Sequence, residues 1–104
     1  MGRVVYWDLY KEFSFSYNDT NLTAQDMQKI AEIVDYVKRN PSLKVGIDGT
    51  AVRSRDQVLN DARVNSIREA MIDAGVSPDR IWVGAIGDKH LRVKGRIAVF
   101  FTTI

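Results

Sequence analysis

Arg63 is the residue with the clearest capacity for chemistry, because its charge conflicts with its place in a predicted helix. At about 100° per residue, Arg63 falls roughly 40° from Leu59 and roughly 40° from Ile67, inside the apolar face. The charged Asp61 and Arg68 fall on the opposite side, where solvent is expected. A guanidinium that faces a core needs acceptors or an anion, and its planar fork suits a carboxylate. Arg63 is therefore predicted to bind a ligand carboxylate, to pair within the chain, or to extend its head past the helix to solvent.

Other residue types argue against catalysis. His90 is the only histidine, and it lies in a polar loop without a serine or cysteine motif that would make it a catalytic base. The chain has no cysteine, which excludes disulfides and thiolate metal sites. Asp8 and Glu12 share a strand face but show no acid–base pairing. We expect no enzyme activity, no cofactor and no metal site.

Composition indicates one ordinary globular domain. The 104 residues are 45% hydrophobic and 27% charged, and the net charge is only +2, which disfavours disorder and a general affinity for nucleic acid. No apolar run approaches the roughly 20 residues of a membrane-spanning helix. The start at Met1 and Gly2 does not resemble a signal peptide. We expect residues 1–104 to form a single domain taken from a longer parent chain.

The first half of the chain predicts a strand, a helix and a second strand. Residues 4–17 alternate, and the expected buried face holds Val5, Trp7, Leu9, Phe13, Phe15 and Tyr17. After a polar turn at 18–21, Thr23 and Asp26 have the spacing of a capping box. The helix continues to Asn40 and Pro41 with an apolar stripe of Met27, Ile30, Ala31, Val34 and Val37. The alternation of residues 43–48 predicts the second strand.

The second half predicts a helix and two strands. The helix that carries Arg63 follows a polar connection, and Gly75, Val76 and Pro78 have the order of a helix end with a left-handed cap. Residues 80–86 and 96–102 are predicted strands joined by a basic loop. The order β-α-β-α-β-β favours parallel neighbours across the helices and a last strand antiparallel to the third. We expect an α/β (α+β) two-layer sandwich, with a mixed four-stranded sheet and both helices on one face.

The chain resembles the OmpA-like domain, the peptidoglycan-binding module of the OmpA/MotB family. The family's opening strand and turn are similar to residues 15–22, and its second strand is similar to residues 45–52. Its helix pattern, with an arginine and a closing glycine, is similar to residues 59–76. Its last two strands are similar to residues 80–87 and 96–99. The blocks cover nearly the whole chain, in the family's order.

The resemblance implies a fold, a ligand and a location. Members of the family bind the diaminopimelate of a peptidoglycan stem peptide, and Arg63 matches the arginine that meets its carboxylate. Arg96 matches the pocket arginine that opens the last strand, Asn18 matches an acidic position, and Asn60 matches a serine. The implied location is the periplasm of a Gram-negative bacterium, where the domain would attach an outer-membrane or secretion component to the cell wall. Any membrane attachment would come from other parts of the parent chain.

Three differences from the family pattern affect the implied pocket. Thr50, Ala51 and Val52 stand where the family has His-Thr-Asp, so the aspartate that binds the ligand's ammonium is missing. The connection that follows Gly49 and the loop that precedes Arg96 are both shorter than in the family. Asp56 or Asp48 could supply the missing carboxylate. Thr50 and the 49–56 connection would complete the pocket.

Two alternatives remain beside peptidoglycan binding. A degenerate domain of this fold could serve as a protein-interaction module in an envelope assembly, with Arg63 paired internally. A cytoplasmic nucleic-acid-binding sandwich would instead use aromatic residues on the open sheet face, for which Tyr6 and Tyr10 are the candidates. The basic residues of loop 89–94, together with Arg53 and Arg55, form either a solvated edge or a rim that attracts anions.

Overall fold

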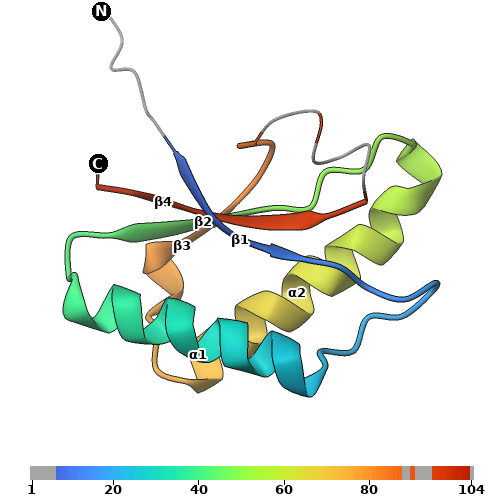
Figure 1. Ribbon diagram of the computed structural model, residues 1–104. Helices are drawn as coiled ribbons and strands as arrows, with labels where there is room; N and C mark the ends of the chain where they lie inside the picture. The colour runs from blue at the N-terminus through green and yellow to red at the C-terminus, as the bar shows by residue number, and fades with distance from the viewer. Residues whose placement is uncertain (1–6, 88–89, 91–94, 104) are drawn as a thin grey trace, which may run out of the picture.

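The chain folds as a sheet with two helices packed on one side (Figure 1). This computed structural model describes residues 7–87, 90 and 95–103. The elements in chain order are β1 (Asp8–Phe13), α1 (Ala24–Arg39), β2 (Lys44–Asp48), α2 (Gln57–Asp73), β3 (Ile81–Val83) and β4 (Ile97–Thr102). Short 3-10 turns at Ser54–Asp56 and Pro78–Arg80 precede α2 and β3. The predicted two-layer α+β architecture is confirmed.

The sheet is mixed and has the strand order β1-β4-β2-β3. β2 and β3 are parallel neighbours, as the intervening helix predicts. β4 is antiparallel to both of its neighbours, β1 and β2. The last strand is thus antiparallel to β3, as predicted, but it does not pair with β3. β1 and β2 share a direction without being neighbours, because β4 lies between them.

One hydrophobic core joins the two layers. It includes Phe13 of β1, Val45 and Ile47 of β2, and Val99 of β4, none of which is exposed. α1 contributes Ile30, Ile33, Val34 and Val37, while α2 contributes Val64, Ile67 and Met71. Burial of these large apolar side chains is the main favourable term that fixes the helices on the sheet.

Side-chain hydrogen bonds satisfy backbone groups at both ends of α1. The Thr23 hydroxyl accepts the Asp26 N–H at 3.1 Å, and the Asp26 carboxylate accepts the Thr23 N–H at 3.0 Å, which confirms the capping box. At the other end, the Arg80 guanidinium donates to the carbonyls of Val37 and Leu43 at 3.0 Å and 2.8 Å. The predicted stripe was partly wrong, because the helix buries Ile33 whereas Met27 and Ala31 are exposed.

α2 ends as its residues predict. Gly75 has φ +105°, and the Val76 N–H donates to the Met71 carbonyl at 3.0 Å. Val76 is buried, which supplies the hydrophobic contact expected after a left-handed cap. Arg63 lies on the buried side of this helix with Ile67 and Met71, so its predicted place on the core-facing side is confirmed.

The first strand differs from the prediction because it contains a bulge. Its pairing with β4 skips Tyr10 between Leu9 and Lys11. The extra residue reverses the alternation of side chains. The prediction of one uninterrupted buried face over residues 4–17 was therefore wrong within the described residues. Leu9 is 48% exposed, whereas the Tyr10 ring packs at a tilt beside Phe101 and Tyr36 against the core. Val5 and Tyr6 lie outside the described residues.

The third strand is shorter than the predicted 80–86. It ends at Val83, and the chain then folds so that Ile86 contacts the sheet at Gly46. A Cβ on Gly46 would lie 2.6 Å from Ile86 Cδ1 and 2.7 Å from Trp7 Cζ3. Ile86 and Trp7 therefore cover the sheet face opposite the helices at this point. Tyr10 lies on the helix side, which was not the place expected for a base-stacking residue.

Candidate functional site

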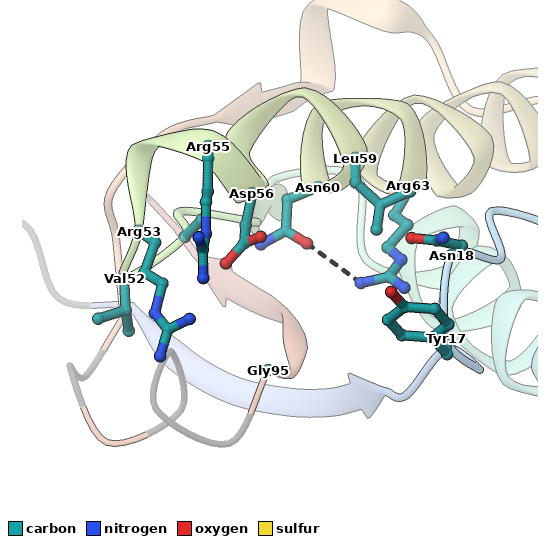
Figure 2. Close-up of a pocket in the computed structure, with 11 residues that line it drawn as sticks. Tyr17, Asn18, Val52, Arg53, Arg55, Asp56, Leu59, Asn60, Arg63 and Gly95 are labelled. Carbon is teal, nitrogen blue, oxygen red and sulfur yellow. Dashed lines mark hydrogen bonds between the residues drawn. The ribbon is translucent and has the colours of Figure 1, made fainter.

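A pocket of about 710 Å³ lies between the start of α2 and the turn that follows β1 (Figure 2). Arg63, Asn60 and Leu59 line it from α2, while Tyr17 and Asn18 line it from the turn. The connection before α2 supplies Ala51, Val52, Arg53, Arg55 and Asp56, and Gly95 lies at the far side. The size is in the range of small-ligand sites.

Arg63 is 9% exposed, and neutral oxygens hold its guanidinium. Nε donates to the Asp19 carbonyl at 2.9 Å, Nη2 donates to the Ser16 carbonyl at 3.1 Å, and Nη1 donates to Asn60 Oδ1 at 3.3 Å. The guanidinium carbon also lies 5.1 Å from the centre of the Phe15 ring. Among the described residues no carboxylate forms an ion pair with Arg63. The predicted internal ion pair is therefore not formed within this part of the chain.

The geometry leaves donor capacity on Arg63. A guanidinium has five N–H groups, and these three bonds use one each on Nε, Nη1 and Nη2. One N–H on each terminal nitrogen has no acceptor among the described residues. Such a pair of N–H groups on one planar fork is what a carboxylate binds.

The turn at residues 16–20 is built to present carbonyls to α2. The Asp19 N–H donates to the Ser16 carbonyl at 2.9 Å, and Asn18 adopts a left-handed conformation with φ 55°. Asparagine tolerates this conformation better than most residues. The Ser66 hydroxyl, one turn after Arg63, donates to the Thr20 carbonyl at 2.9 Å. Arg63 and Ser66 together fasten this turn to the helix.

Gln57 fixes the other wall of the pocket, and the sequence reasoning missed it. Its Oε1 accepts the Ala51 N–H at 2.9 Å, and its Nε2 donates to the Gly49 carbonyl at 3.1 Å. These bonds tie the connection before α2 to the first turn of the helix. A glutamine at a helix start is common, so only its place opposite a short polar connection could have indicated this role.

Asp48 lies at the end of β2 but outside the pocket. The buried carboxylate accepts the N–H groups of Ile86 and Gly87 through Oδ2, at 2.9 Å and 2.6 Å. Oδ1 accepts the Thr50 N–H at 2.9 Å. Asp48 therefore organises the chain after β3, and Asp56 is the carboxylate that lines the pocket.

The structure brings four of the six candidate residues together. Asn18, Asp56, Asn60 and Arg63 line the same pocket. Thr50 and Arg96 are not among its lining residues: Thr50 is half-buried in the turn beside Asp48, and Arg96 is exposed just before β4. Of the basic loop, residues 89 and 91–94 lie outside the described residues, and His90 is exposed.

The pocket is cationic. The described residues that line it include three arginines, Arg53, Arg55 and Arg63, and a single carboxylate, that of Asp56. Arg53, Arg55 and Asp56 are exposed and form no ion pair with one another or with another described residue. Within the described residues no cluster of histidine, aspartate and glutamate could hold a metal ion.

The family model described as the OmpA family matches residues 14–99. The chain belongs to the OmpA family. The match spans both helices, all strands after β1 except the end of β4, and every described pocket residue. No curated protein matches the chain in sequence.

Solved structures show the same OmpA-family fold at low identity. The OmpA-like domain of FopA1 from Francisella tularensis has 18% identity and a TM-score of 0.70, with 93% of this chain and 78% of that chain covered. The C-terminal domain of MotB from Helicobacter pylori has 17% identity and a TM-score of 0.70, with coverages of 91% and 86%. An outer membrane protein from Borrelia burgdorferi has 15% identity and a TM-score of 0.65, with 97% of each chain covered. None of the described helices is long and apolar enough to cross a membrane.

Proposed function

We propose that this OmpA-family domain binds the stem peptide of peptidoglycan without covalent chemistry. In this proposal Arg63 holds a carboxylate of the peptide, and Asn18, Asn60 and Asp56 line the rest of the pocket. The domain would lie in the periplasm and attach a larger envelope or secretion component to the cell wall. Thr50 and Arg96 would act at the margin, since they do not line the pocket.

The observation that carries the proposal is the state of Arg63. Arg63 is nine-tenths buried as a residue, and its guanidinium is bonded only to neutral oxygens and has two further N–H groups to donate, which suits an anion in the pocket. Its three existing bonds hold the fork in one orientation, so binding requires little further ordering of this side chain. Membership of the OmpA family supports a cell-wall ligand.

One observation favours a second candidate function. Val52 stands at the position where the family has an ammonium-binding aspartate, and it is 65% exposed at the pocket. A domain of this fold that has lost the aspartate for the ligand's ammonium could act as a protein-interaction module in an envelope assembly. Binding to purified cell walls separates the two functions.

The test is co-sedimentation with purified sacculi. The wild type is expected to sediment with the sacculi, and Arg63→Ala is expected to lose most of this binding. Arg39→Ala is the matched control, because Arg39 carries the same charge but pairs with Asp35 on the surface of α1. Absence of wild-type binding would exclude the proposal and leave the interaction module. Equal binding by Arg63→Ala would show that this pocket is not the site.

A further inference from the structure

The charges of the pocket are separated along its length. Figure 2 shows Arg63 at one end, beside Tyr17 and Asn18, and Arg53 and Arg55 at the other end. Asp56 and Asn60 lie between them. A ligand that fills the pocket therefore meets a fixed guanidinium at one end and two exposed guanidinium groups at the other.

This arrangement suits two carboxylates better than a carboxylate and an ammonium. The described lining has a net charge of +2, so an ammonium group would approach three guanidinium groups and one carboxylate. That carboxylate, Asp56, lies beside Arg53 and Arg55, which reduce the negative potential that it offers. The start of α2 adds a partial positive charge at the same place.

The uncharged part of the lining suits an acyl group. Val52 and the 94% exposed Tyr17 offer apolar surface to the pocket, and Ala51 and Leu59 add to it. An amide is neutral and planar, so it can lie against such surface without the desolvation cost of an ammonium ion.

Building on the proposed function, we infer that the pocket selects stem peptides whose diaminopimelate side-chain amine is acylated, as in cross-linked peptidoglycan, over peptides with a free amine. One carboxylate of the peptide binds Arg63. A second carboxylate binds Arg53 and Arg55 at the other end, while the acylated amine lies against the apolar part of the lining between them, where Leu59 stands.

Calorimetric titration with two synthetic stem peptides tests the inference. The peptides are identical except that the diaminopimelate amine is free in one and acetylated in the other. The acetylated peptide is expected to bind about two- to fivefold more tightly, the size of a partly exposed charge interaction. Equal affinity, or tighter binding of the free amine, would overturn the inference.

Two variants test which side chains cause the preference for the acetylated peptide. In the double variant Arg53→Ala/Arg55→Ala the preference for the acetylated peptide is expected to disappear, whereas Arg39→Ala is expected to retain it. Asp56→Asn is expected to strengthen binding of both peptides, because it removes the only carboxylate among the described lining residues. A specific loss of free-amine binding in Asp56→Asn would overturn the inference, since Asp56 would then be the ammonium partner.

These outcomes separate the two proposals. If sacculi bind through Arg63 but the free-amine peptide is preferred, only the selectivity for acylated stems is wrong. If neither peptide binds and sacculi do not bind, the proposed function fails as well. The sedimentation and titration experiments therefore report on different claims.

Discussion

Arg63 combines a structural role with an unused binding capacity. Its bonds to the Ser16 and Asp19 carbonyls connect the turn after β1 to α2. Because these acceptors are neutral and lie near the pocket, water can replace some of the hydrogen bonds that Arg63 donates. Arg63→Ala is expected to lower the free energy of unfolding by about 1.5–3 kcal/mol, the range for hydrogen bonds to a charged group.

Urea unfolding of Arg63→Ala measures this change. A loss of about 3–5 kcal/mol would instead indicate that a carboxylate had been left without its buried partner. An unchanged midpoint would show that the three hydrogen bonds contribute nothing to stability. Either result would contradict the role given to Arg63 in the structure.

Asp48 is a second residue whose effect can be predicted. Three backbone N–H groups point at its buried carboxylate. Asp48→Asn replaces one acceptor oxygen with an NH₂ group that cannot accept them, and it is expected to cost about 1.5–3 kcal/mol. Thermal or urea unfolding checks the change, with the exposed Asp56→Asn as the control. Equal stability of the two variants would contradict the role of Asp48.

At the residue scale, helical geometry alone was enough to single out Arg63. A cation on an apolar face is an energetic conflict that can be read without a structure. The choice between Asp48 and Asp56 could not be made in this way. Both carboxylates flank the same connection. Asp48 accepts N–H groups from the distant residues Ile86 and Gly87, whereas Asp56 lines the pocket, and this difference depends on the tertiary fold.

At the scale of elements, the contact between β2 and α2 sets the position of the pocket. Gly49 follows β2 directly, and a Cβ there would lie 2.2 Å from Val64 Cγ2 and 3.3 Å from Ile97 Cδ1. The absence of a side chain lets the start of α2 approach the end of the strand. The Gly49 carbonyl also accepts a hydrogen bond from Gln57, so the same residue fixes both the approach and the connection.

Gly49→Ala is expected to destabilise the protein by about 1–3 kcal/mol, because the extra methyl overpacks this contact. The matched control is Gly84→Ala, since a Cβ at Gly84 would meet nothing within 4 Å. Chemical unfolding compares the two variants. The expected difference arises from packing alone, so similar midpoints for Gly49→Ala and Gly84→Ala would contradict the close approach.

Elements could be predicted where the residues that define them are close in the sequence, and not where those residues are distant. Both helices were located because their ends depend on adjacent residues, such as Thr23 with Asp26 and Gly75 with Val76. The bulge at Tyr10 was not predicted, because it depends on pairing with β4, a strand about 90 residues later in the chain. The early end of β3 has the same origin, since Asp48 captures the N–H groups of Ile86 and Gly87.

At the scale of the whole molecule, the hydrophobic core supports the pocket. The core draws residues from both helices and all strands, and the pocket lies at the edge where α2, the turn after β1 and the connection after β2 meet. The pocket walls are held by hydrogen bonds from Arg63, Ser66 and Gln57 rather than by core packing. Changes at the exposed rim are therefore expected to alter binding with little effect on folding.

The whole-molecule charge gives the last prediction. The net charge of +2 is small, yet three of the arginines lie around one pocket, so in the proposed function the attraction of an anionic wall depends on their local field. The two exposed arginines are open to screening, which acts over about 10 Å at 0.1 M salt. Sacculus binding by the wild type is expected to weaken as salt rises. The double variant Arg53→Ala/Arg55→Ala is expected to bind more weakly at low salt and to show a flatter dependence, because the buried Arg63 is screened less.

Arg39→Ala has lost one charge outside the pocket, so it should follow the wild-type slope. Co-sedimentation over a salt series measures all three. If sacculus binding by Arg39→Ala also depended less on salt than that of the wild type, net charge and not the pocket would attract the wall.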